Sequence, residues 1–254
     1  MCNFAIVKYR IMTDKLKILT ENLYTTFADY QGKSKLEGSP LYDDLDIWKK
    51  ELRSKKLREL TDEDLSRFAG SVIYTWGDED DFRCYLPRIL ELTAELKTPY
   101  DIWDLYNRLE EANWKTWDIN EQTAINEFTI ELWNNLLSDN SEKAEFEFED
   151  YFHAIAYFYS DFSEILKVWE TNNYLSSAKH LANYVFYERQ HLFEKNFIDS
   201  REKNTKNISE FKTWLVSDKI IKKIEQAFFE NENEEIAERF SCVEQILDYE
   251  KKYN

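Results

Sequence analysis

Two short motifs in this chain pair a carboxylate with a histidine three residues later. They are Asp150-Tyr-Phe-His153 and Glu188-Arg-Gln-His191. Residues three apart share a face of a helix, and di-iron carboxylate bundles place a Glu-x-x-His motif on each of two helices. The pattern therefore suggests a metal site made of Asp150, His153, Glu188 and His191. Such a site also needs a glutamate from each of two further helices, and the aspartate at position 150 departs from the pattern.

The same composition that provides these motifs weakens them as evidence for metal binding. Acidic residues number 50 in 254, so a carboxylate three residues before a histidine arises easily by chance. No GxSxG, SxxK, HExxH, Walker or GxGxxG pattern occurs, and the three cysteines are widely separated without a CxxC pair. We therefore predict no catalytic residues and no cofactor, and favour a role other than that of an enzyme.

Carboxylates that alternate with aromatic residues are the second feature of the sequence that could form a functional site. The clearest example is the run AEFEFEDYF over residues 144–152, and a second cluster follows the Trp-Gly pair at 76–77. Rings can anchor a partner while the surrounding charges steer its approach. The residues that we predict to contact a partner on this basis are Trp76, Asp78, Asp80, Asp81, Glu145, Glu147 and Glu149.

The formal net charge of −17 limits the classes of partner. Nucleic acids and anionic membranes would be repelled, so we expect neither to be bound. A basic protein would be attracted. The sequence contains no apolar run of 18 residues and no secretory segment, which favours a cytoplasmic protein.

Glycine and proline are scarce, and this decides the fold class. The chain contains 4 Gly and 3 Pro, too few for the turns of β or α/β folds. Apolar residues recur at spacings of three and four from end to end, as in Leu16, Leu19 and Leu23. We predict an all-α fold of about eleven helices, either an irregular multi-helical bundle or a loosely HEAT-like stack. It should form a single domain, 1–254, with a possible weak boundary near the polar stretch 199–207.

Capping residues predict where several helices begin. The expected caps are Thr61, which forms a capping box with Asp64, and Asp78, Asp118 and Ser141. The helix after Thr61 is expected to include Trp76 and to end at Gly77 with a positive φ. Pro87 is expected to start a further helix.

One segment resembles other proteins. Residues 57–96 read LRELTDEDLSRFAGSVIYTWGDEDDFRCYLPRILELTAEL. This is similar to uncharacterised bacterial helical proteins in which a capped helix precedes TWGD, then DDF, then LPRILEL. The resemblance covers about forty residues; it implies a helical fold and a bacterial source, and no activity.

These observations favour a non-catalytic acidic binding protein. Its most concrete form is an immunity or inhibitor protein that neutralises a basic toxin or nuclease by covering its active site. Two alternatives stay open: a helical-bundle metal-dependent enzyme that uses both acid-x-x-His motifs, and a helical scaffold with a peptide-binding groove. The sequence does not fix the oligomeric state.

Overall fold

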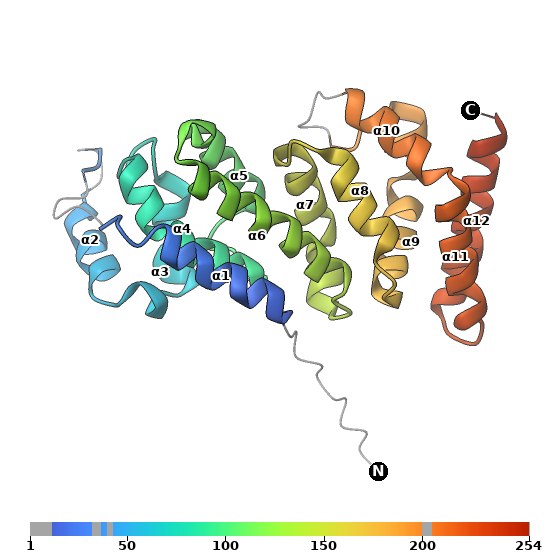
Figure 1. Cartoon of the computed structure of the whole chain (residues 1–254), viewed down its shortest axis with the longest axis horizontal. Coiled ribbons are helices and arrows are strands. Elements are labelled where there is room, and N and C mark those ends of the chain that lie inside the picture. Colours follow the sequence, from blue (N-terminus) through green and yellow to red (C-terminus); the bar gives the residue numbers. More distant parts are fainter. Residues whose placement is uncertain (1–11, 32–36, 40–42, 200–204, 254) are drawn as a thin grey trace, which may run out of the picture. The chain divides into compact units, whose positions relative to one another are not determined.

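The all-α prediction is confirmed by a computed structural model that describes residues 12–31, 37–39, 43–199 and 205–253 (Figure 1). Helices make up 75% of the structure, and the described residues contain twelve α-helices and no strand. None of the described helices combines the length and the apolar character needed to cross a lipid bilayer. The chain divides into two compact units, Met1–Leu132 and Trp133–Asn254, and the division falls inside a helix. The polar stretch 199–207 lies within the second unit, and its residues 200–204 lie outside the described part.

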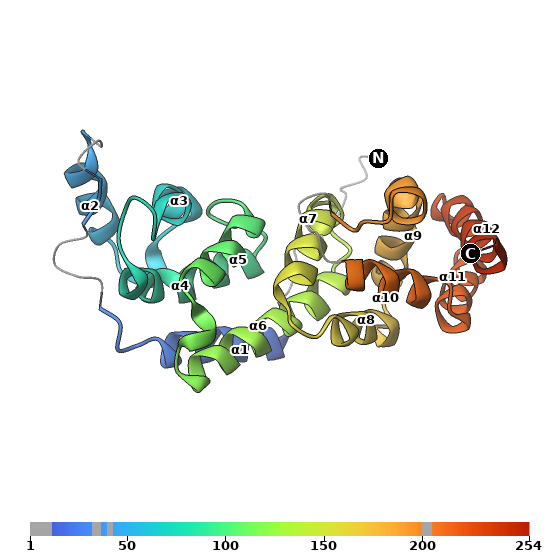
Figure 2. The same ribbon diagram turned by 90° about the horizontal axis from the view of Figure 1, so that it is seen from above.

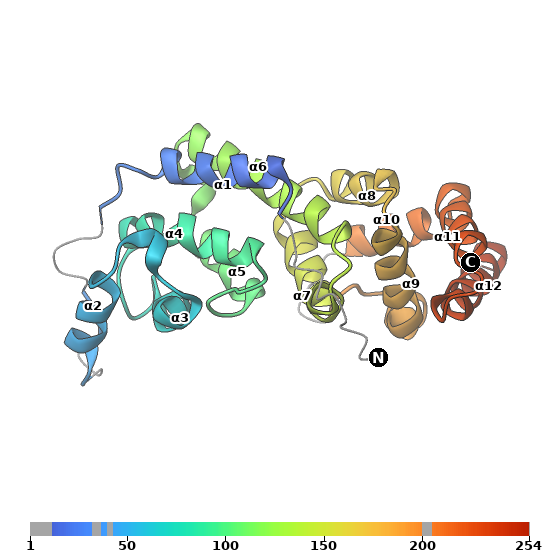
Figure 3. The ribbon, with the colours of Figure 1, turned by 90° about the horizontal axis from the view of Figure 1, so that it is seen from below.

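The first unit contains the N-terminal helices. They are α1 (Asp14–Thr26), α2 (Leu45–Arg53), the 3-10 turn η1 (Leu57–Glu59), α3 (Asp62–Ser71), α4 (Glu79–Ala94), α5 (Ile102–Glu111), the 3-10 turn η2 (Trp114–Thr116) and the first part of α6 (Ile119–Leu137). Helix α1 runs antiparallel to α6, as Figure 3 shows. At the start of α1 the Thr13 hydroxyl donates to Glu131 in the later part of α6 at 3.1 Å, and at the end of α1 Phe27 packs on Trp117, just before α6. Helix α4 contacts both α1 and α3.

The second unit contains the end of α6 and the remaining helices. They are α7 (Glu142–Phe158), α8 (Phe162–Thr171), α9 (Leu175–Arg189), the π-helical segment η3 (Gln190–Lys195), α10 (Thr205–Leu215), α11 (Asp218–Glu230) and α12 (Ile236–Tyr253). Helices α11 and α12 form an antiparallel pair, visible in Figure 2, and Lys251 near the end of α12 bonds Asp218 at the start of α11. Helix α9 packs on α7, α11 and α12.

The four predicted helix caps are confirmed. Thr61 and Asp64 form a capping box on α3, and Asp78 and Asp81 form one on α4. The Asp118 carboxylate accepts the Asn120 amide at 2.8 Å at the start of α6, and the Ser141 hydroxyl accepts the Ala144 amide at 3.1 Å in α7. These caps depend only on neighbours in sequence, which is why the sequence reveals them.

Two predicted helix boundaries between Thr61 and Pro87 are wrong, although Gly77 has the positive φ expected of it, 76°. Helix α3 ends at Ser71, and Ile73 adopts a left-handed φ of 73° in the turn that follows. The β-branched pair Val72–Ile73 disfavours continuation of the helix, so Trp76 lies in the turn and Gly77 precedes the cap of α4. Pro87 lies inside α4 rather than at its start, because the capping box at Asp78 begins the helix nine residues earlier.

Candidate functional site

The first acid-x-x-His motif places its histidine in the core of the second unit. His153 Nδ1 lies 3.0 Å from Asp199 Oδ2, and His153 Nε2 lies 2.9 Å from the Tyr184 hydroxyl. All three side chains are buried. Burial raises the pKa of Tyr184 well above its usual value, so the phenol keeps its proton and can donate to Nε2. The motif's own carboxylate, Asp150, is exposed on α7 and is not the partner of His153.

The second motif forms the local pair that its spacing predicts. His191 Nδ1 bonds Glu188 Oε2 at the end of α9, and the imidazole ring stacks on Phe197 with 4.9 Å between ring centroids. Each histidine thus contacts a different carboxylate. Among the residues that the structure describes, no group of three or more His, Cys, Asp or Glu side chains is arranged to hold a metal ion.

The turn between α3 and α4, which contains Trp76, is held by aromatic packing and by the helix cap of α4. Trp76 is buried and packs edge-on against Phe68, with 5.5 Å between ring centroids. Asp78 accepts the amides of Asp80 and Asp81, both at 3.1 Å, and the buried Asp81 carboxylate accepts the Asp78 amide. Of the four residues predicted here to contact a partner, Asp78 and Asp80 are exposed, while Trp76 and Asp81 have structural roles in the first unit.

The acidic run on α7 presents one of its two alternating phenylalanines to solvent. Phe146 is 84% exposed, whereas Phe148 is buried and stacks on His180 with 4.4 Å between ring centroids. Side chains two positions apart on a helix point about 200° away from each other, so Phe146 and Phe148 face opposite sides of α7. One turn from Phe146 on the same exposed side lie Glu142, Glu149 and Asp150.

Glu145, the residue before Phe146, connects α7 to α9 and, through Asn183, to α12. Asn183 Nδ2 donates to Glu145 Oε1 at 2.7 Å, and Arg239 Nη1 donates to Asn183 Oδ1 at 2.9 Å. The Arg239 guanidinium lies 4.0 Å from the Phe186 ring centroid and 4.8 Å from that of Tyr187. We call the surface formed by the following residues the acidic–aromatic face: Glu145, Phe146, Glu149, Asn183, Phe186, Tyr187 and Arg239.

This face combines exposed rings with negative charge. Tyr187 is 68% exposed, and the Arg239 guanidinium holds its ring and that of Phe186 in place. Partial burial raises the pKa of Glu149; the charges of Glu188 and Asp150 raise it further, against an opposing effect of His153. The third predicted carboxylate, Glu147, is half-buried and already interacts within the protein.

Sequence reasoning identified part of this face. Glu145 and Glu149 were among the predicted residues, and the alternation of rings and carboxylates pointed to α7. Phe186, Tyr187 and Arg239 are not among the residues predicted from the sequence, and no pattern marks them, since α9 buries successive side chains elsewhere, as at Tyr184 and Val185. No known protein family, curated protein or solved structure matched this chain.

Proposed function

We propose that this protein is a binding module that recognises a basic partner protein through the acidic–aromatic face. The observation that carries the proposal is the 84% exposure of Phe146 among carboxylates. Burying a phenylalanine side chain contributes roughly 1.5–3 kcal/mol, so a ring left in water is a ready anchor for a partner.

Rigidity supports the same proposal. Interfaces draw most of their binding energy from a few desolvated aromatic and arginine side chains that are held in place before binding. Arg239 fixes Phe186 and Tyr187, and Asn183 links Arg239 to Glu145 on α7. The partner therefore meets a preformed surface.

Charge supports a basic partner. The chain carries 50 acidic and 33 basic residues, and Glu149 lies near Glu188 and Asp150. Complementary charge raises the rate of encounter and excludes acidic competitors. In its most concrete form, the protein is an immunity or inhibitor protein that covers the active site of a basic toxin or nuclease.

A photo-cross-linking experiment in cells that make the protein natively tests this. Phe146 is replaced by p-benzoylphenylalanine, irradiated, and the captured protein is identified by mass spectrometry. Phe229 is the matched control, because it is also an exposed phenylalanine of the second unit, 61% exposed, but lies outside the face. We expect position 146 to capture a basic protein that position 229 does not. Capture of the same proteins at both positions, or of acidic proteins only, would contradict the proposal.

Charge reversal provides the first quantitative prediction. The double variant Glu145→Lys with Glu149→Lys should slow association with the captured partner by roughly tenfold at about 0.1 M salt, and by much less at about 1 M, where the Debye length is short. The control variant reverses Glu232 and Glu234, exposed residues between α11 and α12. Equal slowing by both variants would show that net charge alone, not this face, drives association.

A second candidate function is favoured by one further observation. An open groove of about 990 Å³ runs between α8 and α10 and is lined by Leu166, Lys167 and Trp214. A helical scaffold could hold an extended peptide there. If this groove binds the partner instead, a bulky side chain at the exposed lining residue Thr213, as in Thr213→Arg, should abolish capture, while Phe146→Ala should leave the affinity unchanged.

A further inference from the structure

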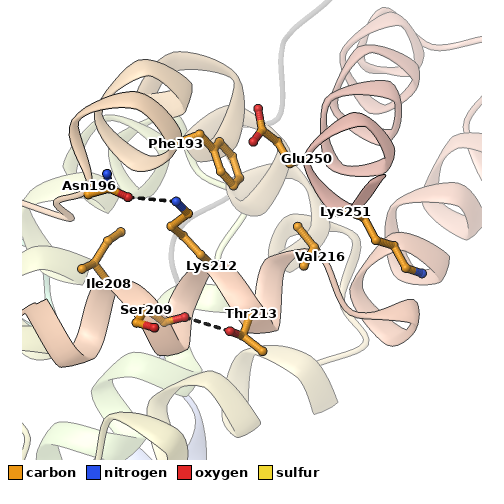
Figure 4. Close-up of a pocket in the computed structure, with 9 residues that line it drawn as sticks. All are labelled: Phe193, Asn196, Ile208, Ser209, Lys212, Thr213, Val216, Glu250 and Lys251. Carbon is orange, nitrogen blue, oxygen red and sulfur yellow. Dashed lines mark hydrogen bonds between the residues drawn. The ribbon is translucent and has the colours of Figure 1, made fainter. Parts of the chain in front are cut away.

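A small pocket in the second unit lies between the π-helical segment, α10 and α12 (Figure 4). Its volume is about 390 Å³, within the range of small-molecule sites. Phe193 of the π-helical segment, Ile208 of α10 and Val216, which directly follows α10, form apolar walls, and Lys212 projects between them from α10. The pocket shares no residue with the acidic–aromatic face.

The backbone on one side of the pocket has an unusual conformation. Helix α9 passes into six residues of π-helix, which ends at Asn196 with a left-handed φ of 59°. The Asn196 and Phe197 amides both donate to the carbonyl of His191. A π-helical turn and a left-handed non-glycine residue are both less stable than regular helix, and such departures occur often at functional sites.

This conformation holds a cation at the edge of the pocket. Asn196 Oδ1 accepts a hydrogen bond from Lys212 Nζ at 2.9 Å, and the ammonium lies 5.7 Å from the centroid of the Phe193 ring. No carboxylate among the described residues pairs with Lys212, whereas Lys251 at another edge of the pocket pairs with Asp218. An ammonium has three donors, so Lys212 keeps donors for a ligand.

The pocket also contains an acidic residue, and its setting differs from that of Lys212. Glu250 is buried and already interacts within the protein. In Figure 4 its carboxylate and the Lys212 ammonium lie on either side of the Phe193 ring. Among the described residues, Lys212 has an amide oxygen as its partner and no carboxylate.

We propose that this pocket binds a small organic carboxylate with an apolar or aromatic body. The carboxylate accepts hydrogen bonds from Lys212, and charge-assisted bonds of this kind are the stronger ones in proteins. The body of the ligand packs against Phe193, Ile208 and Val216. A ligand with a phosphate or with several charges fits less well, because among the described lining residues Lys212 is the cation that no carboxylate pairs with, and the walls are apolar.

Benzoate is the probe, and methyl NMR of the full chain, observing Ile208 and Val216, is the measurement. We expect saturable shifts with a Kd on the order of 1 mM, as suits so small a ligand. Benzamide has the same shape without the charge, and should bind at least roughly tenfold more weakly. Lys212→Met should weaken benzoate binding by a similar factor, while Lys212→Arg should retain it.

Three results would overturn the proposal. They are equal binding of benzoate and benzamide, unchanged benzoate binding in the Lys212→Met variant, and no saturable shift of Ile208 or Val216. A second variant, Asn196→Gly, guards against misfolding at position 212, because glycine accepts the left-handed φ of 59° at that position. It leaves the ammonium in place but unanchored, so benzoate should bind more weakly than to the natural chain and more tightly than to the Lys212→Met variant. Binding equal to that of the natural chain would show that the Asn196 anchor plays no part.

Discussion

The two units hold their aromatic residues by different means. In the first unit, arginines cover the rings: the Arg58 guanidinium lies 3.6 Å from the Tyr24 centroid, Arg83 lies 4.2 Å from that of Trp117 and Arg108 lies 3.7 Å from that of Tyr74. In the core of the second unit, rings cover rings, whereas its arginine contact, that of Arg239 with Phe186 and Tyr187, lies at the surface. Trp169 alone contacts, within 6.5 Å between centroids, the rings of Trp133, Phe148, Phe152, Tyr184, Phe211 and Trp214.

This difference reaches the surface. Among the described residues of the first unit, the exposed large apolar side chains are isoleucines and tyrosines: Ile18, Ile47, Tyr74, Tyr100 and Ile119. In the described residues, all three strongly exposed phenylalanines (Phe146, Phe186 and Phe229) lie in the second unit. The three histidines of the chain, His153, His180 and His191, also lie there. The comparison teaches that the unit with the ring-on-ring core also carries the exposed phenylalanines of the described residues and the histidines.

The largest expected effect is that of Trp169→Ala. This side chain is fully buried at the centre of the ring cluster, and its Nε1 donates to the Ser177 carbonyl at 3.1 Å. Removing it should lower the free energy of unfolding of the second unit by about 3–5 kcal/mol. Hydrogen exchange resolved by segment, followed through a urea titration, measures each unit separately. Equal loss in both units would show that their stabilities are not separable.

A smaller effect is expected on mild acidification. Burial against Phe148 lowers the pKa of His180, whose Nε2 lies 3.0 Å from the Asp139 carbonyl. Below the unfolded pKa of about 6.5, the unfolded chain binds a proton that the folded protein does not. Stability should therefore fall as pH falls below that value, by at most about 1.4 kcal/mol per pH unit.

The effect of acid should be confined to the second unit, since the first contains no histidine. His180→Gln keeps an amide donor for Asp139 and cannot titrate, so it should remove this part of the pH dependence. His191→Gln, at a side chain that is 39% exposed, is the matched control. An unchanged slope in His180→Gln would assign the pH dependence to other groups.

The smallest effect is expected at Gly77 in the first unit. Its φ of 76° disfavours any side chain, so Gly77→Ala should lower the free energy of unfolding by about 1 kcal/mol. Gly70→Ala is the control, because Gly70 lies inside α3 and a new Cβ would meet only the exposed Tyr100 ring, at 3.2 Å. Equal effects of the two substitutions would mean that the φ at position 77 carries no cost.

Local features were predictable from the sequence, and distant pairings were not. The caps at Thr61, Asp78, Asp118 and Ser141 depend on contacts within three residues. The partner of His153 is Asp199, which is 46 residues away in a stretch that reads as a polar linker. The π-helical segment before Asn196, which contacts α10, matches none of the sequence patterns that mark helix ends.

The acidic–aromatic face was predictable in part for the same reason. Alternation of rings and carboxylates marks α7, but periodicity alone does not say whether Phe146 or Phe148 faces the core. That choice depends on which side of α7 meets Trp133 and Trp169, a contact between residues far apart in the chain. Arg239, from α12, could not be connected to Phe186 and Tyr187 without the structure.

The most direct test of the proposed face is the dissociation rate of the captured partner from the Phe146→Ala variant. A desolvated anchor acts after encounter, so its loss should raise the dissociation rate about 30-fold, equivalent to about 2 kcal/mol, and leave association almost unchanged. Phe229→Ala should have no such effect. A dissociation rate that is the same in Phe146→Ala as in the natural chain would contradict the assignment of the acidic–aromatic face as the binding surface.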